Sequence, residues 1–181
     1  MSTTNYDISL LKRPYRPCVG LMVFNKNGQV FCGQRIDNKA EAWQLPQGGI
    51  DEGETPIEAG FRELKEETSI VNVQYVCDYP DWLNYEISLP LADTLWNGKY
   101  RGQVQRWLLF YFIGKNSEIN INTKNPEFKT WEWIEPNQLP LRAISFKKEV
   151  YVKITKAFIP ILNNFNASKL EERKLKWKKI I

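Results

Sequence analysis

The chain has 181 residues, 43% of them hydrophobic, which suits a single domain with a sizeable buried core. Its 25 Lys and Arg residues against 21 Asp and Glu residues give a net charge of +4. The sequence contains no histidine, which excludes His-based nucleophilic catalysis, His-ligated zinc and imidazole acid–base chemistry. Carboxylates, Lys, Tyr, Cys or a carboxylate-bound metal remain for any reaction.

The cysteines and the N-terminal residues indicate a soluble, cytoplasmic protein. Cys18, Cys32 and Cys77 are odd in number and form no Cys-x-x-Cys pair, so we expect buried free thiols in a reducing compartment. The first residues, MSTTNYDISLLKRPYRP, lack an apolar core of signal-peptide length, and no run of about 18 apolar residues occurs. We therefore expect no membrane among its partners.

The predicted elements of the N-terminal half are mainly strands. Residues 17–35 hold two apolar, β-rich runs on either side of Asn27-Gly28, which predicts a tight hairpin. Residues 41–49 (EAWQLPQGG), interrupted by Pro46 and two glycines, indicate a loop with a short strand. This loop leads into an acidic segment.

Farther along the chain, residues 71–78 predict a strand, and residues 104–114 (VQRWLLFYFIG) predict a central buried one because they are almost continuously apolar. The polar, aromatic and glycine-containing residues 79–103 favour a long irregular loop. Residues 130–135 (TWEWIE) alternate in character, which predicts another strand.

The C-terminal part predicts an amphipathic helix within residues 145–165 that packs on the sheet, with a kink at Pro160. Its apolar residues recur at helical spacing: Val150, Ile154, Ala157, Phe158, Ile161 and Phe165. From Ser168 onward the chain carries six basic and two acidic residues, which we expect as a short helix or a disordered tail. The predicted organisation is one domain over residues 1–166 and a basic tail over residues 167–181.

Negative charge is concentrated between Gly48 and Ile70. This stretch has seven acidic and two basic residues, a net charge of −5, which leaves +9 for the rest of the chain. Thr55-Pro56-Ile57-Glu58 predicts a helix start, with Thr as N-cap, Pro in the first turn and Glu completing a capping box. A helix over 56–68 places one set of residues on a packed face, Ile57, Phe61, Leu64 and Thr68, and another on an acidic face, Glu63, Glu66 and Glu67.

Two interpretations of the acidic face remain open from these residues. It is either a solvated helix face or a site for a hard divalent cation, Mg²⁺ or Mn²⁺, which takes oxygen ligands and shares them with phosphate. Two neighbours favour the cation: the backbone at Gly48-Gly49 is able to approach a ligand closely, and Glu54 stands where it can pair with Arg62.

The spacing of these residues resembles the Nudix box, G-x5-E-x7-R-E-U-x-E-E-x-G-U, where U is a bulky aliphatic residue. The match runs through Gly48, Glu54, Arg62-Glu63-Leu64 and Glu66-Glu67, and departs only at Ser69, where the family has the Gly that suits a left-handed helix cap. The resemblance implies an α/β protein, a Nudix α/β/α sandwich with a mixed sheet, in which the box forms a loop–helix–loop.

The same resemblance implies roles for the matching residues. Glu63, Glu66 and Glu67 are implied metal ligands, with Glu63 also a candidate to activate water, and Arg62 and Glu54 a supporting ion pair. The implied chemistry is attack of water on a phosphoanhydride, with the metal neutralising charge on the leaving oxygen. Coupled carboxylates titrate as a group, so no single base is assigned.

Segments outside the box extend the resemblance, over about residues 14–158, to the bacterial RNA pyrophosphohydrolases, a group also described as dinucleoside polyphosphate hydrolases. These segments are Tyr15-Arg16-Pro17, WQLPQGG at 43–49, GQVQRW at 102–107, Pro126-Glu127-Phe128, WEW at 131–133 and SFKKEVY at 145–151.

The extended resemblance implies further site residues. Glu127 becomes a metal ligand or catalytic carboxylate, Arg35 and Lys147 phosphate ligands, and Phe146 a base-stacking residue. Gly48, Gly49, Gln44 and Tyr85 are further candidates for the same pocket. From the residues alone, without the resemblance, other interpretations remain open: Glu127 as a surface residue, Arg35 as a solvated residue at a strand end and Phe146 as part of the core.

Three functional hypotheses follow. In the first, a metal-dependent enzyme removes pyrophosphate from the 5′-triphosphate end of RNA, leaves a monophosphate and thereby promotes RNA decay. In the second, dinucleoside polyphosphates such as diadenosine tetraphosphate are the main substrate; the basic remainder of the chain suits either polyanion. The third is a non-catalytic RNA-binding module, against which the intact acidic triad argues. No stable protein partner is implied.

Overall fold

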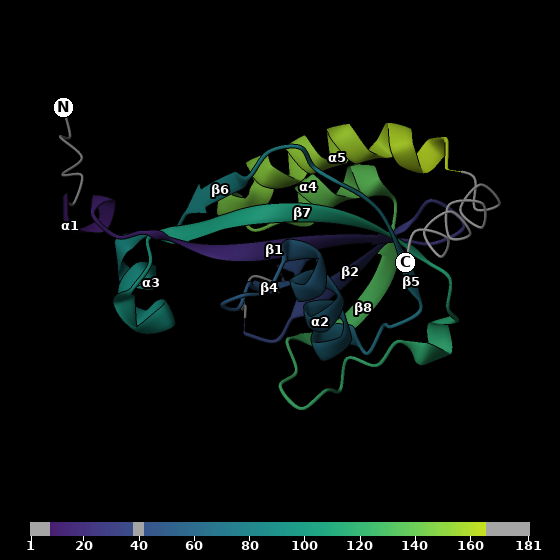
Figure 1. Ribbon diagram of the computed structural model, residues 1–181, viewed down its shortest axis with the longest axis horizontal. Helices are drawn as coiled ribbons and strands as arrows, with labels where there is room; N and C mark the ends of the chain where they lie inside the picture. The colour runs from purple at the N-terminus through teal and green to yellow at the C-terminus, as the bar shows by residue number, and fades with distance from the viewer. Residues whose placement is uncertain (1–7, 38–41, 166–181) are drawn as a thin grey trace.

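A mixed sheet forms the centre of the molecule in the computed structural model, which describes residues 8–37 and 42–165. The sheet follows the order β3-β2-β1-β7-β5, with β4, β6 and β8 pairing to β1, β7 and β2 (Figure 1). The strands are β1 Tyr15–Phe24, β2 Val30–Arg35, β3 Trp43–Gln44, β4 Gln47–Gly49, β5 Val73–Asp78, β6 Leu83–Glu86, β7 Gly102–Phe112 and β8 Phe128–Ile134.

Helices cover both faces of the sheet, so the predicted α/β/α sandwich is confirmed (Figure 1). They are α1 Ile8–Leu11, α2 Pro56–Thr68, α3 Leu89–Thr94, α4 Leu139–Arg142 and α5 Lys148–Asn163, with 3₁₀ turns η1 Leu95–Gly98, η2 Asn116–Glu118, η3 Pro136–Gln138 and η4 Ser145–Lys147. One core cluster lies between the sheet and α5, and the other lies between the sheet and α2.

The centre of the sheet is the parallel pair β1 and β7. Their register runs from Tyr15 opposite Gly102 to Phe24 opposite Tyr111. Because helices cover both faces, both strands are almost continuously apolar, and the predicted central strand is confirmed. The hairpin is also confirmed: Phe24 pairs with Val30 across a turn in which Gly28 has φ 77°.

The prediction of an irregular loop over residues 79–103 was wrong. This segment contains β6, α3 and η1. Leu83 and Tyr85 point inward from β6, which pairs with β7, and α3 has a Pro in its own first turn. A four-residue strand and a six-residue helix are too short to produce a clear periodic pattern in the sequence. The strand forms because it pairs with β7, which is distant in sequence.

The packed face of α2 is rotated relative to the prediction. Leu64 and Thr68 are buried as expected, but Ile57 and Phe61 are 40% and 41% exposed. Ala59 and Gly60 are buried in their place, because these small residues let the helix approach Leu21 and Leu108 of the sheet closely. Phe61 still packs on Phe110 of the central strand β7, with ring centroids 5.0 Å apart and planes at 72°.

The long C-terminal helix agrees with the prediction in its inner face and differs at its end. Val150, Ile154 and Phe158 are buried, but Ile161 is 37% exposed and Leu162 is buried instead. The helix continues for three residues beyond Pro160 to Asn163. The predicted tail over 167–181 lies outside the described residues, and the division into residues 1–166 and 167–181 stays a prediction.

Two further expectations concern thiols and membranes. Cys18, Cys32 and Cys77 are free, the first two buried and the third half-buried. Across the described ranges, no helix has both the length and the apolar character needed to cross a membrane.

Candidate active site

Helix α2 presents the acidic residues, and local sequence determines where it begins and ends. The amide of Glu58 donates to Thr55 Oγ1 at 3.3 Å and the amide of Thr55 donates to Glu58 Oε2 at 2.9 Å, so the predicted capping box is present. At the other end Ser69 adopts the left-handed conformation, φ 60°, that the family motif reserves for Gly. Its amide donates to Lys65 O, and its hydroxyl donates to Asn120 O at 3.0 Å.

Arg62 ties this helix to β4 and to the preceding loop. Its Nε and Nη2 donate to the two oxygens of Glu54 at 2.8 and 2.7 Å, which is the expected ion pair. Nη2 also donates to Gly49 O, and Nη1 donates to Glu63 Oε1, both at 2.8 Å. The hydrogen bond from Arg62 holds the pKa of Glu54 below its usual value.

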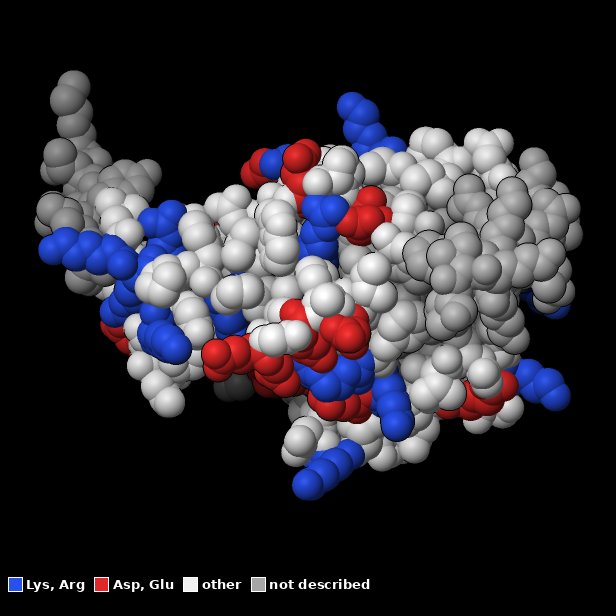
Figure 2. Space-filling view, viewed as in Figure 1, with Lys and Arg blue, Asp and Glu red and all other residues white. Residues whose placement is uncertain are grey.

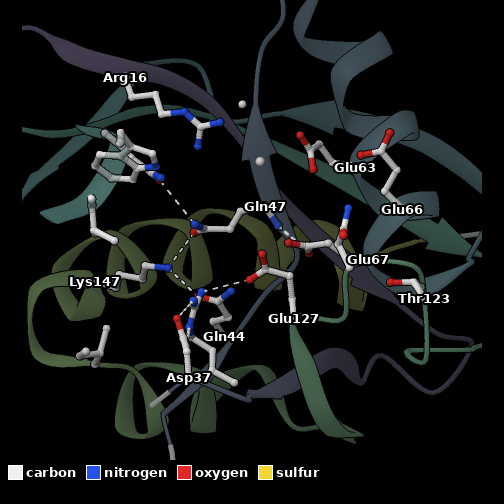
Figure 3. Close-up of a pocket in the computed structure, with 18 of the residues that line it drawn as sticks. Arg16, Asp37, Gln44, Gln47, Glu63, Glu66, Glu67, Thr123, Glu127 and Lys147 are labelled. Carbon is white, nitrogen blue, oxygen red and sulfur yellow. Dashed lines mark hydrogen bonds and ion pairs between the residues drawn. The ribbon is translucent and has the colours of Figure 1, made fainter. Parts of the chain in front are cut away.

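The two glycines of β4 are required by the side chains that lie against them. A Cβ on Gly48 would coincide with the carboxyl group of Glu63, and a Cβ on Gly49 would clash with the guanidinium of Arg16. Arg16 and Glu63 therefore lie on either side of this strand (Figure 3). Glu63 is largely buried, and desolvation raises its pKa, while Arg62 opposes the shift.

Glu67 is the most buried of the acidic side chains in the box, at 6% exposure. Its Oε2 accepts a hydrogen bond from the amide of Gln47 at 3.1 Å. Burial raises its pKa well above the usual value, and the charges of Glu127 and Glu63 add to the effect. Glu67 has no cationic partner among the described residues, whereas Glu66 is 59% exposed and lies 3.5 Å from Arg62 Nη1.

These carboxylates suit a hard divalent cation by their chemistry. Glu63, Glu66, Glu67 and Glu127 line one cavity (Figure 3). In the described ranges, no three Asp, Glu or Cys side chains converge as a closed set of metal ligands, because Arg62 draws Glu63 and Glu66 toward itself. Glu67 is nevertheless buried without a counter-ion, and the carboxylates of Glu63 and Glu127 lie near it. This arrangement fits a hard cation, which prefers oxygen ligands.

A buried lysine lies deeper in the same cavity. Lys147 is 5% exposed, and its Nζ donates to Gln44 Oε1 at 2.7 Å and to Gln47 Oε1 at 2.8 Å. Burial and the charge of Arg35 lower its pKa to about 7, while Glu67 and Glu127 oppose the shift. Gln44 Nε2 is buried without a hydrogen-bond partner among the described residues, and the Gln44 side chain lines the cavity.

Arg35 is less available for phosphate than the sequence suggests. It forms a two-pronged ion pair with Asp37, through Nε to Oδ1 at 2.6 Å and Nη2 to Oδ2, and its Nη1 lies 3.5 Å from Glu127 Oε2. Phe146, by contrast, is half-buried and stacks on Tyr85 with ring centroids 5.2 Å apart and planes at 30°. Lys147 Nζ lies 5.8 Å from the centre of the Tyr85 ring.

The cavity has a volume of about 1240 Å³, and all of the sequence-predicted site residues except Glu54 line it. Glu54 lies outside the cavity and accepts hydrogen bonds from Arg62. Acidic side chains gather over α2 on the face in Figure 2, with basic side chains toward the end where α1 and α3 lie. The sequence predictions missed Arg16, Gln47 and Trp96 as lining residues. Arg16 and Gln47 belong to segments that resemble the RNA pyrophosphohydrolases, and this resemblance could have identified both as site residues. Trp96 lies in the segment that was predicted as a loop, where no such signal exists.

A mixed sheet lies between helices, and a capped helix places carboxylates in one cavity with a buried lysine and buried glutamines, an arrangement typical of hydrolases. Residues 14–154 match the NUDIX domain model. The chain therefore belongs to the Nudix family, whose hydrolases generally use divalent metal ions.

Similar proteins extend this assignment. A relative from Cereibacter sphaeroides (strain KD131 / KCTC 12085), named RNA pyrophosphohydrolase, is 46% identical over 157 residues, covering 86% of this chain and 97% of its own. The E. coli dihydroneopterin triphosphate pyrophosphohydrolase is 19% identical with a TM-score of 0.63, over 80% of this chain and 99% of its own. A C. elegans Ap4A hydrolase complex is 21% identical with a TM-score of 0.58, over 80% and 98%. The two structures support the fold.

Proposed function

We propose that this protein is an RNA pyrophosphohydrolase that removes pyrophosphate from the 5′-triphosphate end of RNA and leaves a 5′-monophosphate. The observation that carries the proposal is the 46% identity, over 86% of the chain, to a relative of that name. The cavity supports it, because carboxylates suited to a divalent cation share it with a buried lysine, the unpartnered amide nitrogen of Gln44 and a stacked aromatic pair.

In this proposal Glu63, Glu66, Glu67 and Glu127 hold Mg²⁺ or Mn²⁺. The bound cation supplies charge neutralisation at the phosphates and acidifies water. Arg62 holds Oε1 of Glu63, which leaves Oε2 for a proton or the cation. Glu54 and Arg62 keep Glu63 oriented, and the glycines of β4 leave space for the carboxyl group and the substrate.

The substrate is held on the other side of the cavity. Lys147 has one donor left beyond its two glutamine partners, and Gln44 Nε2 is free to donate to a phosphate oxygen. Arg35 contributes positive charge, although Asp37 and Glu127 share it. Phe146 and Tyr85 offer a surface on which the base near the 5′ end stacks, which suits single-stranded RNA with little sequence preference.

Conversion of the 5′-triphosphate to a 5′-monophosphate exposes a transcript to decay, and we place this reaction in the cytoplasm. The three free thiols suit a reducing compartment. No stable protein partner is part of the proposal.

The test is release of pyrophosphate from a 5′-triphosphorylated RNA with Mg²⁺ or Mn²⁺. We expect Glu63→Gln to lower kcat/KM by at least about 100-fold, the range lost with an acid–base group, while the thermal unfolding curve stays close to that of the wild type. Glu52→Gln is the matched control, since Glu52 is an exposed acid in the loop that precedes α2. Full activity of Glu63→Gln would contradict the proposal.

The same assay separates the other hypotheses. A kcat/KM much higher for diadenosine tetraphosphate than for RNA would make dinucleoside polyphosphates the main substrates. An absence of hydrolysis with every pyrophosphate, together with RNA binding that a chelator does not change, would indicate a non-catalytic RNA-binding module.

A further inference from the structure

A row of cations and aromatic rings leads from the cavity to the outer surface of the molecule. It starts with Arg16 and Trp96, which both line the cavity; the guanidinium carbon of Arg16 lies 5.6 Å from the centre of the indole ring. Trp96 packs edge to face with Tyr100, with ring centroids 6.0 Å apart. Lys99 Nζ lies 5.2 Å from the centre of the Tyr100 ring. Because Tyr100 and Lys99 do not line the cavity, this η1 row (Arg16, Trp96, Tyr100 and Lys99) continues beyond it.

The η1 row depends on a sharp turn of the backbone. Trp96, Asn97 and Gly98 have consecutive positive φ values of 50°, 55° and 71°, a conformation that residues other than Gly rarely adopt. Within three residues the chain passes from the half-buried Trp96 in the wall of the cavity to the exposed Lys99. Backbone conformations of this kind concentrate at ligand-binding sites. The turn thus connects the cavity with the outer surface.

The cations on this surface are available to a ligand. Within residues 8–37 and 42–165, Lys12, Arg16 and Lys99 form no ion pair with a carboxylate. Lys12 follows Leu11, whose carbonyl accepts a hydrogen bond from Arg101, so it belongs to the same end of the molecule. Two neighbouring arginines already have carboxylate partners, Arg13 with Asp93 at 2.6 Å and Arg101 with Glu86 at 3.3 Å. Basic side chains gather at this end, where α1 and α3 lie (Figure 2).

The η1 row also continues the wall on which the first base is proposed to stack. Tyr85, Ile87 and Trp96 belong to one segment, from β6 to η1, and all three line the cavity. A transcript is far larger than a cavity of about 1240 Å³, so all but its first few nucleotides lie outside it. Aromatic rings that stack bases, next to cations that pair with phosphates, are the groups that bind single-stranded RNA.

We propose that the η1 row and Lys12 form a track for the single-stranded RNA that leaves the cavity, so that the protein binds the body of the transcript as well as its triphosphate end. The rings stack bases, and the lysines pair with backbone phosphates. The inference rests on the proposed function and deepens it, since it assigns the downstream nucleotides of the substrate to a surface outside the cavity. Neither lysine lines the cavity, so the track contributes to RNA affinity and not to the chemical step.

Binding is measured separately from hydrolysis, with an unstructured RNA of about 15 nucleotides that has a 5′-hydroxyl group and therefore lacks the reacting phosphates. Fluorescence anisotropy gives its Kd over a range of salt concentrations. The double variant Lys12→Gln/Lys99→Gln loses two phosphate contacts. We expect it to bind at least about tenfold more weakly at low salt, and to reduce the slope of log K against log[salt] by about 1.4.

A second variant tests the rings, and a matched control tests the location of the charge. Tyr100→Leu should lower the affinity about fivefold or more without changing the salt slope, because stacking releases no counterions. The control Lys26→Gln/Lys156→Gln removes the same net charge from two exposed lysines, one in the turn after β1 and one on α5. It should change the affinity and the slope little.

Hydrolysis links the track to the proposed function. Two triphosphorylated substrates are compared, an RNA of the same length and a trinucleotide. The wild type should have a kcat/KM about tenfold higher for the long RNA, because the track lowers its KM. The double variant Lys12→Gln/Lys99→Gln should lose this preference through a higher KM for the long RNA, and should keep its kcat and its kcat/KM for the trinucleotide. Thermal unfolding verifies that each variant is folded.

The outcomes separate the track from the proposed function. If the 5′-hydroxyl RNA does not bind, or if the double variant binds it as tightly as the control does, the track is rejected even where triphosphorylated RNA is cleaved. Equal losses of kcat/KM for the long RNA and the trinucleotide also reject the track. If the 5′-hydroxyl RNA binds through the two lysines but no triphosphorylated RNA is cleaved, the track stands and the proposed function fails.

Discussion

At the scale of single residues, the site depends on the absence of a side chain at Gly48 as well as on its carboxylates. Gly48 does not have a left-handed backbone conformation. A glycine is required here because the carboxyl group of Glu63 occupies the volume in which a Cβ would lie. The sequence suggested that this glycine lets a ligand approach, and the first group that it admits is a side chain of the protein itself.

Replacing Gly48 by Ala should therefore expel Glu63 from its position. We expect Gly48→Ala to lower kcat/KM for RNA at least about 100-fold, because a displacement of about 1 Å in a catalytic group costs that much, and to change stability less than activity. Gly53→Ala is the contrasting variant, since Gly53 has φ 81° and open space around it. It should lose about 1 kcal/mol of stability and keep its activity. Equal kcat/KM for Gly48→Ala and the wild type would refute this account.

At the scale of elements, α2 is positioned by its two ends and by Arg62. The capping box begins the helix, Arg62 fixes it to Gly49 O, and Ser69 ends it in the left-handed conformation. The hydrogen bond from Ser69 to Asn120 O partly offsets the cost of that conformation, which explains how Ser is accepted where the family motif has Gly.

Substitutions at Ser69 test this explanation. We expect Ser69→Gly to change the free energy of unfolding by less than about 1 kcal/mol, because relief of strain is offset by the lost hydrogen bond and a more flexible unfolded chain. Ser69→Val should destabilise by about 1–2 kcal/mol or more, since a β-branched residue is poorly accommodated at positive φ. Urea unfolding measures both, and a Val variant as stable as the wild type would be inconsistent with the left-handed cap.

The segment from β6 to η1 shows where element prediction fails. Its strand and helix are short, and their positions follow from pairing to β7 and from contacts of Leu91 and Trp96 with the core. Those partners are distant in sequence, so local periodicity does not reveal them.

At the scale of the whole molecule, stability is coupled to the cation through Glu67. Burial, together with the neighbouring Glu127, raises the pKa of Glu67 well above the usual value of 4.5. A group whose pKa is higher in the folded state than in the unfolded state contributes stability below its unfolded pKa. That contribution is lost as the pH rises through the folded value. Without a divalent cation, the molecule should therefore lose stability above the usual range of a glutamate.

Glu67→Gln should remove this loss. In the presence of a chelator we expect the variant to have a Tm several degrees above that of the wild type at about pH 8, with a difference that shrinks toward about pH 5. Added Mg²⁺ should raise the Tm of the wild type and leave the variant less affected. The charge of Glu67 raises the pKa of Lys147, so the difference between the two proteins measures the coupled pair of Glu67 and Lys147. A wild-type Tm that does not respond to pH or Mg²⁺ relative to Glu67→Gln would rule out the coupling.

The sequence by itself determined the class of fold, the helix of the box with its cap, the central strand and the identity of the acidic residues. These features are local: capping, hairpin turns and continuous apolar runs depend on neighbours in the chain, and the box motif specifies residues at fixed spacing.

Only the tertiary structure decided which residues face one another. It turned α2 so that Ala59 and Gly60 pack on the sheet, placed Arg35 Nη1 3.5 Å from Glu127 Oε2, and buried Lys147 among glutamines of β3 and β4. It also brought Trp96 and Arg16 to the same cavity as Glu63. These outcomes depend on packing between segments that are remote in sequence, where the volume and charge of one side chain determine the space left to another.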